Sequence, residues 1–283
     1  KFSIPNTLDE QTAIANYLDH KTTQIDTLIA KKEQFISLLQ EERTAVINQA
    51  VTKGLDPKVK MKDSGIEWLG EIPEHWEIEK LKFKSKIISK GTTPSTVGCE
   101  IIDKGEIRYI KSENIVENCL QNNPKFYIDF ETNQIIKRSQ LEINDVLIVI
   151  AGASIGKVAI LTEEFYPSNT NQAVSFIRLN NVNSSIFVWY WLQTSFIKER
   201  ILFDATQSAQ PNLSMESIGN FPIPKLSNNE EMEITTFLHK KTGEIDTIIA
   251  KTKQEIKLLQ EYKTALISEV VTGKVDVRDV ILN

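Results

Sequence analysis

The sequence has few of the residues that build covalent or metal-bound sites. It contains two cysteines, Cys99 and Cys119, in 283 residues. That is too few for a framework of disulfides, and the pair lacks the spacing of a zinc or redox motif. The three histidines, His20, His75 and His239, all lie outside residues 76–224. A catalytic triad or a histidine-ligated metal in that central segment would need one. These absences predict two free thiols, no metal site and a protein that is not an enzyme.

Glycine and proline are also scarce, at 11 and 9 residues, while 41% of the chain is hydrophobic. This composition excludes collagen-like and disordered chains and predicts a globular protein. No run of eighteen apolar residues occurs, so no segment is expected to cross a membrane. The chain begins at Lys1-Phe2-Ser3 with neither a methionine nor a signal peptide. We expect a cytoplasmic protein, present here as a fragment.

Nucleotide-binding loops are missing as well. Residues 152–157 read Gly-Ala-Ser-Ile-Gly-Lys, which leaves three residues between the glycines, and Val158 follows the lysine. The phosphate-binding loop of nucleotide hydrolases needs four residues there and a Ser or Thr after the lysine. The glycine fingerprint of dinucleotide-binding folds is absent too. Neither ATP nor a dinucleotide is therefore an expected cofactor of this chain.

The net charge is −5 and the sequence pI is about 5.5, which by itself argues weakly against binding to nucleic acid. The charge is unevenly distributed, however. Residues 80–111 carry only three acidic side chains against eight basic ones. The basic residues are Lys80, Lys82, Lys84, Lys86, Lys90, Lys104, Arg108 and Lys111.

The two ends of the chain are copies of one another. When Leu18–Thr52 is aligned with Leu238–Thr272, 20 of 35 positions are identical. The match includes the tripeptide Ile25-Asp26-Thr27, which recurs at residues 245–247. Shared helical composition does not produce identity of this kind, so the segments are an internal duplication.

Both copies show the apolar spacing of three, four and seven residues that is typical of an amphipathic helix. No proline or glycine interrupts residues 8–51, which could form a helix about 65 Å long. Gly54 and Gly273 are expected to end the two helices. The apolar stripes should pair as an antiparallel or crossed coiled coil, within one chain or between subunits. The residues predicted to pair are Ile25, Leu28, Ile29, Ile36, Leu39, Val46, Ile245, Ile249, Ile256, Leu259 and Leu266.

The segment between the copies reads as a mixed α+β domain. Short apolar runs separated by turn residues predict strands at residues 107–110, 146–150, 158–161 and 173–179, and one helix is expected over residues 185–203. The predicted organisation is a first helix at residues 1–52, a connector at 53–75, a globular domain at 76–224 and a second helix at 225–283.

Polar loops recur in this domain at residues 90–95, 111–114, 168–172 and 207–212. Lysine, serine and threonine side chains suit phosphate contacts, and asparagine and glutamine suit base edges. A solvated turn explains each loop alone equally well, but their joint occurrence favours binding. The candidate DNA contacts are Lys90, Thr92, Thr93, Ser95, Lys111, Ser112, Asn114, Lys157, Asn169, Asn171, Gln172, Ser208, Gln210 and Asn212. Lys157 is the weakest of them, because it could instead pack or touch phosphate.

Several motifs resemble the DNA specificity subunit of type I restriction-modification systems. They include Asp63–Trp76, which reads DSGIEWLGEIPEHW, together with Gly91–Ser95 and Ser154–Ala159. Asn171-Gln172-Ala173, Gln210–Ser214 and the Ile-Pro pairs at residues 4–5 and 223–224 also match. Together these motifs extend over nearly the whole chain.

The resemblance implies a non-catalytic protein in which target recognition domains alternate with long helical regions. Each recognition domain would read one half of a split site in double-stranded DNA, mainly through the major groove, and the helices would set the spacing. Methyltransferase subunits would dock on the helices, and a restriction subunit would join the complex. S-adenosylmethionine, ATP and Mg²⁺ would belong to those partners.

On this resemblance, the chain is expected to lack the first recognition domain of such a subunit, apart from its last few residues before the first helix. The chain is therefore expected to be either a truncated subunit or a natural half-subunit that pairs with itself on a palindromic split site. The alternative function is a coiled-coil scaffold or dimerisation protein with no role at DNA.

Overall fold

The computed structural model describes residues 7–206, 212–278 and 280. The chain forms two compact units. One, here called the helical unit, comprises residues 1–43 and 240–283; the other, the central unit, comprises residues 44–239. Within the described residues, no helix combines the length and the apolar character needed to cross a bilayer.

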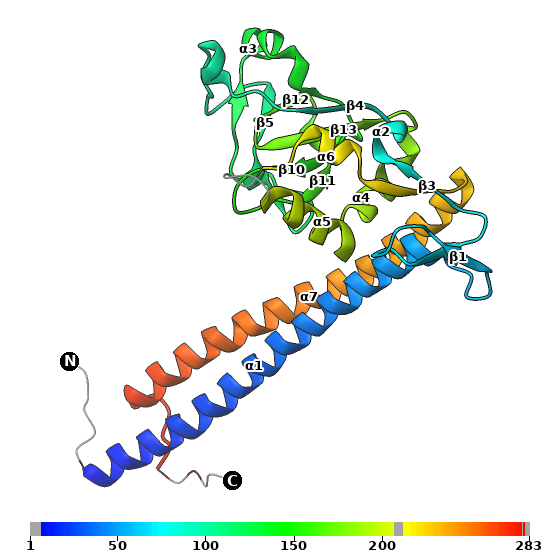
Figure 1. The fold of residues 1–283 in the computed structure, drawn as a ribbon. Helices are drawn as coiled ribbons and strands as arrows, with labels where there is room; N and C mark the ends of the chain where they lie inside the picture. The colour runs from blue at the N-terminus through cyan, green and yellow to red at the C-terminus, as the bar shows by residue number, and fades with distance from the viewer. Residues whose placement is uncertain (1–6, 207–211, 279, 281–283) are drawn as a thin grey trace. The chain divides into compact units, whose positions relative to one another are not determined.

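Two long helices account for most of the helical unit, as the sequence predicts. They are α1, Leu8–Lys53, and α7, Asn228–Val271. Ion pairs join them in this unit, among them Lys32 with Glu255, Arg43 with Asp246 and Lys263 with Asp26. Residue numbers fall on α7 as they rise on α1, so the helices are antiparallel (Figure 1). The α+β class with an antiparallel helix pair is confirmed.

Apolar contacts of the helix pair form two clusters. One contains Ile25, Ile29, Leu259 and Leu266, and the other contains Ile36, Leu39, Ile245 and Ile249. These eight residues therefore lie where the periodicity places them.

Three residues of the predicted stripe do not join those clusters. Leu28 is 44% exposed, because a helix turns by about 100° per residue and position 28 lies beside the stripe that Ile25 and Ile29 define. Val46 packs against the core of the central unit, and Ile256 is half-buried outside both clusters.

The central unit contains two four-stranded sheets. The first has the strand order β11–β10–β13–β4 and is antiparallel throughout. The second has the order β8–β5–β12–β9 and includes one parallel pair, β5 with β12. The strands of the first sheet are β4 (Ser85–Lys90), β10 (Val146–Val149), β11 (Val158–Ile160) and β13 (Val174–Leu179). Those of the second are β5 (Ile107–Ile110), β8 (Tyr127–Ile128), β9 (Gln140–Leu141) and β12 (Ser168–Thr170).

Smaller elements complete this unit. Two-stranded pairs join β1 (Met61–Asp63) to β2 (Glu71–Pro73), β3 (Glu77–Lys80) to β14 (Pro222–Lys225), and β6 (Ile115–Val116) to β7 (Cys119–Leu120). The short helices are α2 (Leu81–Lys84), α3 (Phe130–Ile135), α4 (Ser185–Trp191), α5 (Ser195–Thr206) and α6 (Met215–Gly219). Within the described residues, 3-10 turns lie at Pro94–Val97, Ser112–Asn114, Lys137–Ser139, Glu163–Phe165 and Val182–Ser184.

The single helix expected over residues 185–203 is in fact two helices, α4 and α5. Thr194 donates its hydroxyl to the Trp191 carbonyl at the break. Asn48 of α1 then binds the start of α5, since its side chain accepts from the Ser195 amide and donates to the Ser195 hydroxyl. A side chain almost 150 residues away thus provides the cap, which no local pattern reveals.

The connector packs into the central core instead of forming a loose tether. Leu69, Ile72 and Trp76 are buried in the largest apolar cluster, together with residues from both ends of the unit, such as Val51 and Leu238. The compact units consequently divide the chain inside the two long helices, at residues 43/44 and 239/240, and not at the predicted domain bounds of 52 and 225.

Candidate nucleic-acid interface

Two of the predicted loops leave the second sheet at the same edge. Strands β5 and β12 are parallel, with Ile110 opposite Thr170, so both end at one side. Lys111 follows the first strand and Asn171 follows the second. The Asn171 amide donates to the Ile110 carbonyl at 3.3 Å, and the Thr170 hydroxyl donates to the same carbonyl at 2.8 Å. Parallel pairing therefore brings residues 111–114 and 171–172 together.

The loop at residues 91–95 is attached to these two. The backbone amide of Gly91 donates to the Val174 carbonyl, and the backbone amide of Thr92 donates to the Thr170 carbonyl at 2.9 Å. The hydroxyl of the buried Tyr109 donates to the Thr92 carbonyl at 2.8 Å. Burial raises the pKa of Tyr109 far above its usual value, against the opposing hydrogen bond with Thr93, so the hydroxyl keeps its proton and remains a donor.

Gly91 is required by this close approach. A Cβ atom at position 91 would lie 2.1 Å from the Asn171 carbonyl oxygen and 2.2 Å from that of Thr170. Both atoms belong to the backbone and cannot swing aside. Only glycine therefore lets the two loops meet at this distance.

The first sheet adds its loops at the same place. Strands β4 and β10 both end where β13 begins, with Lys90 opposite Ser175 and Val149 opposite Val174. The segment at Asn212 joins them, because Asn212 forms a bridge to Ala151 and the Leu213 amide donates to Ile150. The Val149 amide donates to the Lys157 carbonyl. We call residues 90–95, 111–114, 171–172, Lys157 and Asn212 the loop cluster.

Ten of the predicted contact residues present at least part of their surface in this cluster. The exposed ones are Lys90, Ser95, Lys157, Gln172 and Asn212. The half-buried ones are Thr92, Thr93, Lys111, Ser112 and Asn171. Ser208 and Gln210 lie outside the described residues.

Asn114 and Asn169 do not fit the expectation of direct DNA contact, because both side chains have no exposed surface. The Asn114 side chain accepts from the Lys111 amide and donates to Pro124 and Gln121. The side-chain NH2 group of Asn169 donates to the side-chain oxygen of Asn133 and to the Ile136 carbonyl. A base contact would require each side chain to leave these partners, at a cost of about 1–3 kcal/mol for each polar group left unpaired. Their role here is to hold the loops in shape.

Not every basic residue of segment 80–111 is free to bind a ligand. Arg108 is 8% exposed and its guanidinium lies 5.1 Å from the centre of the Tyr127 ring, so it belongs to the interior. Lys111 pairs with Glu113 at 3.1 Å, and its ammonium lies 3.9 Å from the centre of the Phe126 ring. Tyr109, which anchors the 91–95 loop, was missed by sequence reasoning, and no spacing or motif marks it out.

The comparisons with known proteins identify the family. The profile described as "Type I restriction modification DNA specificity domain" matches residues 73–258, which include the loop cluster. The chain belongs to this family.

Two curated members extend the match to almost the whole chain. The type I restriction enzyme MjaVIII specificity subunit of Methanocaldococcus jannaschii is 25% identical over 96% of this chain and 61% of its own length. The EcoBI specificity subunit of Escherichia coli is 24% identical over 94% of this chain and 57% of its own. The chain thus spans about three fifths of the length of these specificity subunits.

A solved structure shows the same fold at low sequence identity. A chain from work titled "Structural basis underlying complex assembly and conformational transition of the type I R-M system" aligns with a TM-score of 0.70. The sequences are 10% identical, and the alignment covers 96% of this chain and 61% of that one. The two chains therefore share a fold although few of their aligned residues are identical.

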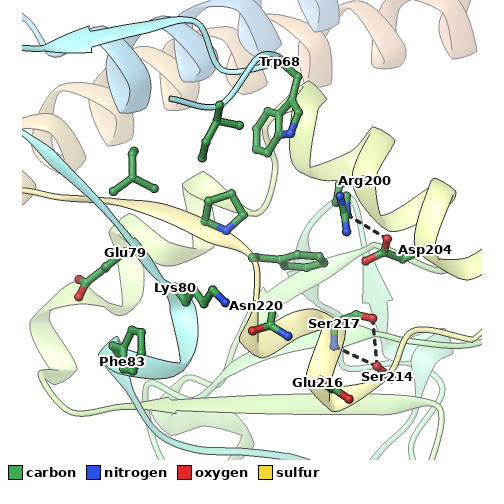
Figure 2. A pocket seen from close by; sticks show the side chains of 14 residues that line it. Trp68, Glu79, Lys80, Phe83, Arg200, Asp204, Ser214, Glu216, Ser217 and Asn220 are labelled. Carbon is green, nitrogen blue, oxygen red and sulfur yellow. Dashed lines mark hydrogen bonds and ion pairs between the residues drawn. The ribbon is translucent and has the colours of Figure 1, made fainter. Parts of the chain in front are cut away.

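The central unit of this specificity-family chain also contains a cavity of about 730 Å³, apart from the loop cluster (Figure 2). Trp68, Phe83 and Phe221 contribute aromatic surface to it. Its Arg200 and Asp204 pair with each other at 2.9 Å, and the Ser217 amide donates to the Ser214 hydroxyl. No histidine or cysteine lines it. The described part of the chain has no group of three or more His, Cys, Asp or Glu side chains placed to hold a metal ion.

Proposed function

We propose that this chain is the DNA recognition component of a type I restriction-modification complex and reads one half of a split target in duplex DNA. The observation that carries the proposal is the convergence of the loop cluster. Five chain segments from two sheets meet there and present lysine, hydroxyl and amide groups on one surface. Lysine and hydroxyl groups suit phosphates, while Gln172 and Asn212 suit base edges in the major groove. Asn171 offers its side-chain NH2 group, because its oxygen accepts from the Ala173 amide.

In this proposal the chain is non-catalytic and binds no cofactor of its own. S-adenosylmethionine, ATP and Mg²⁺ act in the methyltransferase and restriction subunits of the complex. Such a component works on chromosomal DNA, which places it in the cytoplasm.

We place the methyltransferase contacts on the helical unit. Its two helices expose apolar side chains in pairs that the internal repeat relates. Leu28 and Ile248 are 44% and 42% exposed, and Leu38 and Leu258 are 54% and 55% exposed. Single exposed apolar side chains are ordinary on a protein surface, so the support for a docking role is their recurrence at repeat-related positions of both helices. Because they recur with the same exposure in both copies, the helix pair offers two equivalent sites, which suit two copies of one partner.

The proposal is tested by expressing the chain with a methyltransferase subunit from the same genome and mapping methylated adenines. The expected result is one motif made of two short halves separated by an unspecified gap. A scaffold without a role at DNA would leave no motif that depends on this chain. That outcome would contradict the proposal.

Variants of loop-cluster residues test whether this cluster recognises the bases of the motif. Gln172→Ala and Asn212→Ala should relax the motif at individual bases, by about 1–3 kcal/mol for each lost bidentate contact. Lys58→Gln, at an exposed lysine of the connector, is the matched control and should leave the motif unchanged. An unaltered motif in both loop variants would remove these two side chains from base recognition.

A further inference from the structure

The basic segment at residues 80–111 contains lysines that the loop cluster does not use. Lys84 is neutralised inside the protein, since its ammonium lies 2.5 Å from Glu231 and 3.9 Å from Glu79. Lys82 and Lys86 are exposed. In the described part of the chain, neither they nor Lys90 has a carboxylate within ion-pair distance. These three charges are therefore available to a ligand.

Lys82 and Lys86 line one groove. It has a volume of about 320 Å³ and lies between α2, β4 and α6. Asn220 adds an amide to its wall, Gly219 lines it without a side chain, and the Ser85 hydroxyl in the wall donates its proton to the Leu81 carbonyl at 2.7 Å. A Cβ atom at position 219 would lie 3.4 Å from the Lys82 Cβ, so a larger residue there would narrow the groove.

Strand β4 connects this groove to the loop cluster. It is the edge strand of its sheet, and the register against β13 shifts by one residue at Lys86, between the partners Ile87–Arg178 and Ser85–Leu179. A bulge of this kind re-aims the side chain of the extra residue. Lys90, at the other end of the strand, already belongs to the loop cluster. Four residues of extended chain separate the two lysines by about 13 Å, which is the rise of about four nucleotides along a DNA strand.

We propose that the groove between α2, β4 and α6 holds the sugar–phosphate backbone of duplex DNA next to the half-site that the loop cluster reads. This inference rests on the proposed function. Unpaired ammonium groups with a neighbouring side-chain amide are groups that proteins use to bind phosphate. The groove contributes affinity that is independent of base sequence, whereas the loop cluster contributes selectivity.

Glu216 places a negative charge in the same groove as the two lysines. Its carboxylate is the one acidic group among the residues that line the groove, and it is exposed. A carboxylate beside a phosphate track repels the ligand that the lysines attract. Removing it should therefore act in the opposite direction to removing the lysines.

The test uses the full chain and fluorescently labelled duplexes of random sequence, with the binding anisotropy measured from 50 to 200 mM KCl. For the Lys82→Gln/Lys86→Gln variant, the slope of log affinity against log salt should become shallower by about 1.8, because each phosphate contact contributes about 0.9. Across this salt range the change corresponds to about tenfold in affinity. Glu216→Gln should bind more tightly, and Lys58→Gln should match the wild type.

Each outcome separates this inference from the proposed function. If Lys90→Gln weakens binding but the Lys82/Lys86 variant keeps the wild-type slope, the groove is not a DNA track and the loop cluster stands. If the Lys82/Lys86 variant loses methyltransferase in a pull-down while its DNA binding is unchanged, the groove is a protein contact and the inference is overturned. A wild-type chain without salt-dependent duplex binding would contradict both. Circular dichroism of each variant verifies the fold.

Discussion

Asp26 of α1 accepts two hydrogen bonds from the Lys263 ammonium of α7, each at 2.7 Å. The internal repeat relates these residues to Asp246 and Arg43, and that pair is also joined, at 3.0 Å. The apolar clusters follow the same relation, because Ile25, Ile29 and Leu259 in one correspond to Ile245, Ile249 and Leu39 in the other. The duplication is thus matched by these contacts of the helix pair, whereas Leu266 and Ile36 have repeat copies, Val46 and Ile256, that lie outside the two clusters.

The two ion pairs should contribute equally to stability. A double-mutant cycle with Asp26→Asn and Lys263→Gln is expected to give a coupling of about 0.2–1 kcal/mol, since both groups are partly exposed. The cycle with Asp246→Asn and Arg43→Gln should give a similar value. Urea unfolding of the full chain measures both. Couplings that differ by much more than about 0.5 kcal/mol would show that the two halves are not energetically equivalent.

The apolar clusters should dominate the stability of the helix pair. Ile25→Asp places a charge at a position that is 7% exposed and should lower the free energy of unfolding by more than about 2 kcal/mol. Leu28→Asp, three residues later and exposed, should change it by about 0.5 kcal/mol or less. Thermal unfolding distinguishes the two variants. Equal losses would mean that the stripe includes position 28 after all.

Gly91 should be indispensable to the loop cluster. Gly91→Ala forces the 91–95 loop away from Asn171, so DNA binding should fall while the helix content seen by circular dichroism stays unchanged. Gly243→Ala is the contrasting glycine variant, because a Cβ atom at this position of α7 would have no neighbouring atom within 4 Å. It should raise stability by about 0.5–1 kcal/mol through helix propensity. Undiminished DNA binding by Gly91→Ala would show that the loop contact is dispensable.

Glu230 should make stability depend on pH in the acid range. Burial raises its pKa, but hydrogen bonds from Trp76 and His75 outweigh this and leave the pKa below its usual value of 4.5. A carboxyl group with a lowered pKa stabilises the fold fully above its unfolded pKa, and this stabilisation is lost as pH falls through the folded pKa.

Urea unfolding of Glu230→Gln followed by tryptophan fluorescence tests this dependence. The variant should be less stable than the wild type at pH 7, and the two should converge as the pH falls through the lowered folded pKa of Glu230. Glu233→Gln, at an exposed glutamate one turn away, should track the wild type throughout. A difference between Glu230→Gln and the wild type that persists at low pH would assign the effect to packing.

Local pattern was sufficient for the two long helices and for strands β5, β10, β11 and β13. The spacing of apolar residues in α1 and α7 is a property of a few consecutive turns, so their lengths and most of their contact residues follow from the sequence. The duplication indicates that the two stripes pair, and the ion pairs between the helices show that they do so antiparallel and within one chain. The motifs that resemble type I specificity subunits indicated the family, which the comparisons confirm.

The tertiary structure alone decided which polar residues remain available to a ligand. Asn169 in β12 and Asn171 just after it are two residues apart, yet Asn171 is partly exposed and Asn169 is buried against Asn133 and Ile136. Lys84 and Lys86 differ in the same way, since Glu231 of α7 neutralises only the first. In each case the deciding partner lies tens of residues away along the chain. Exposure and pairing depend on such distant contacts, whereas helical and strand periodicity depends on neighbours.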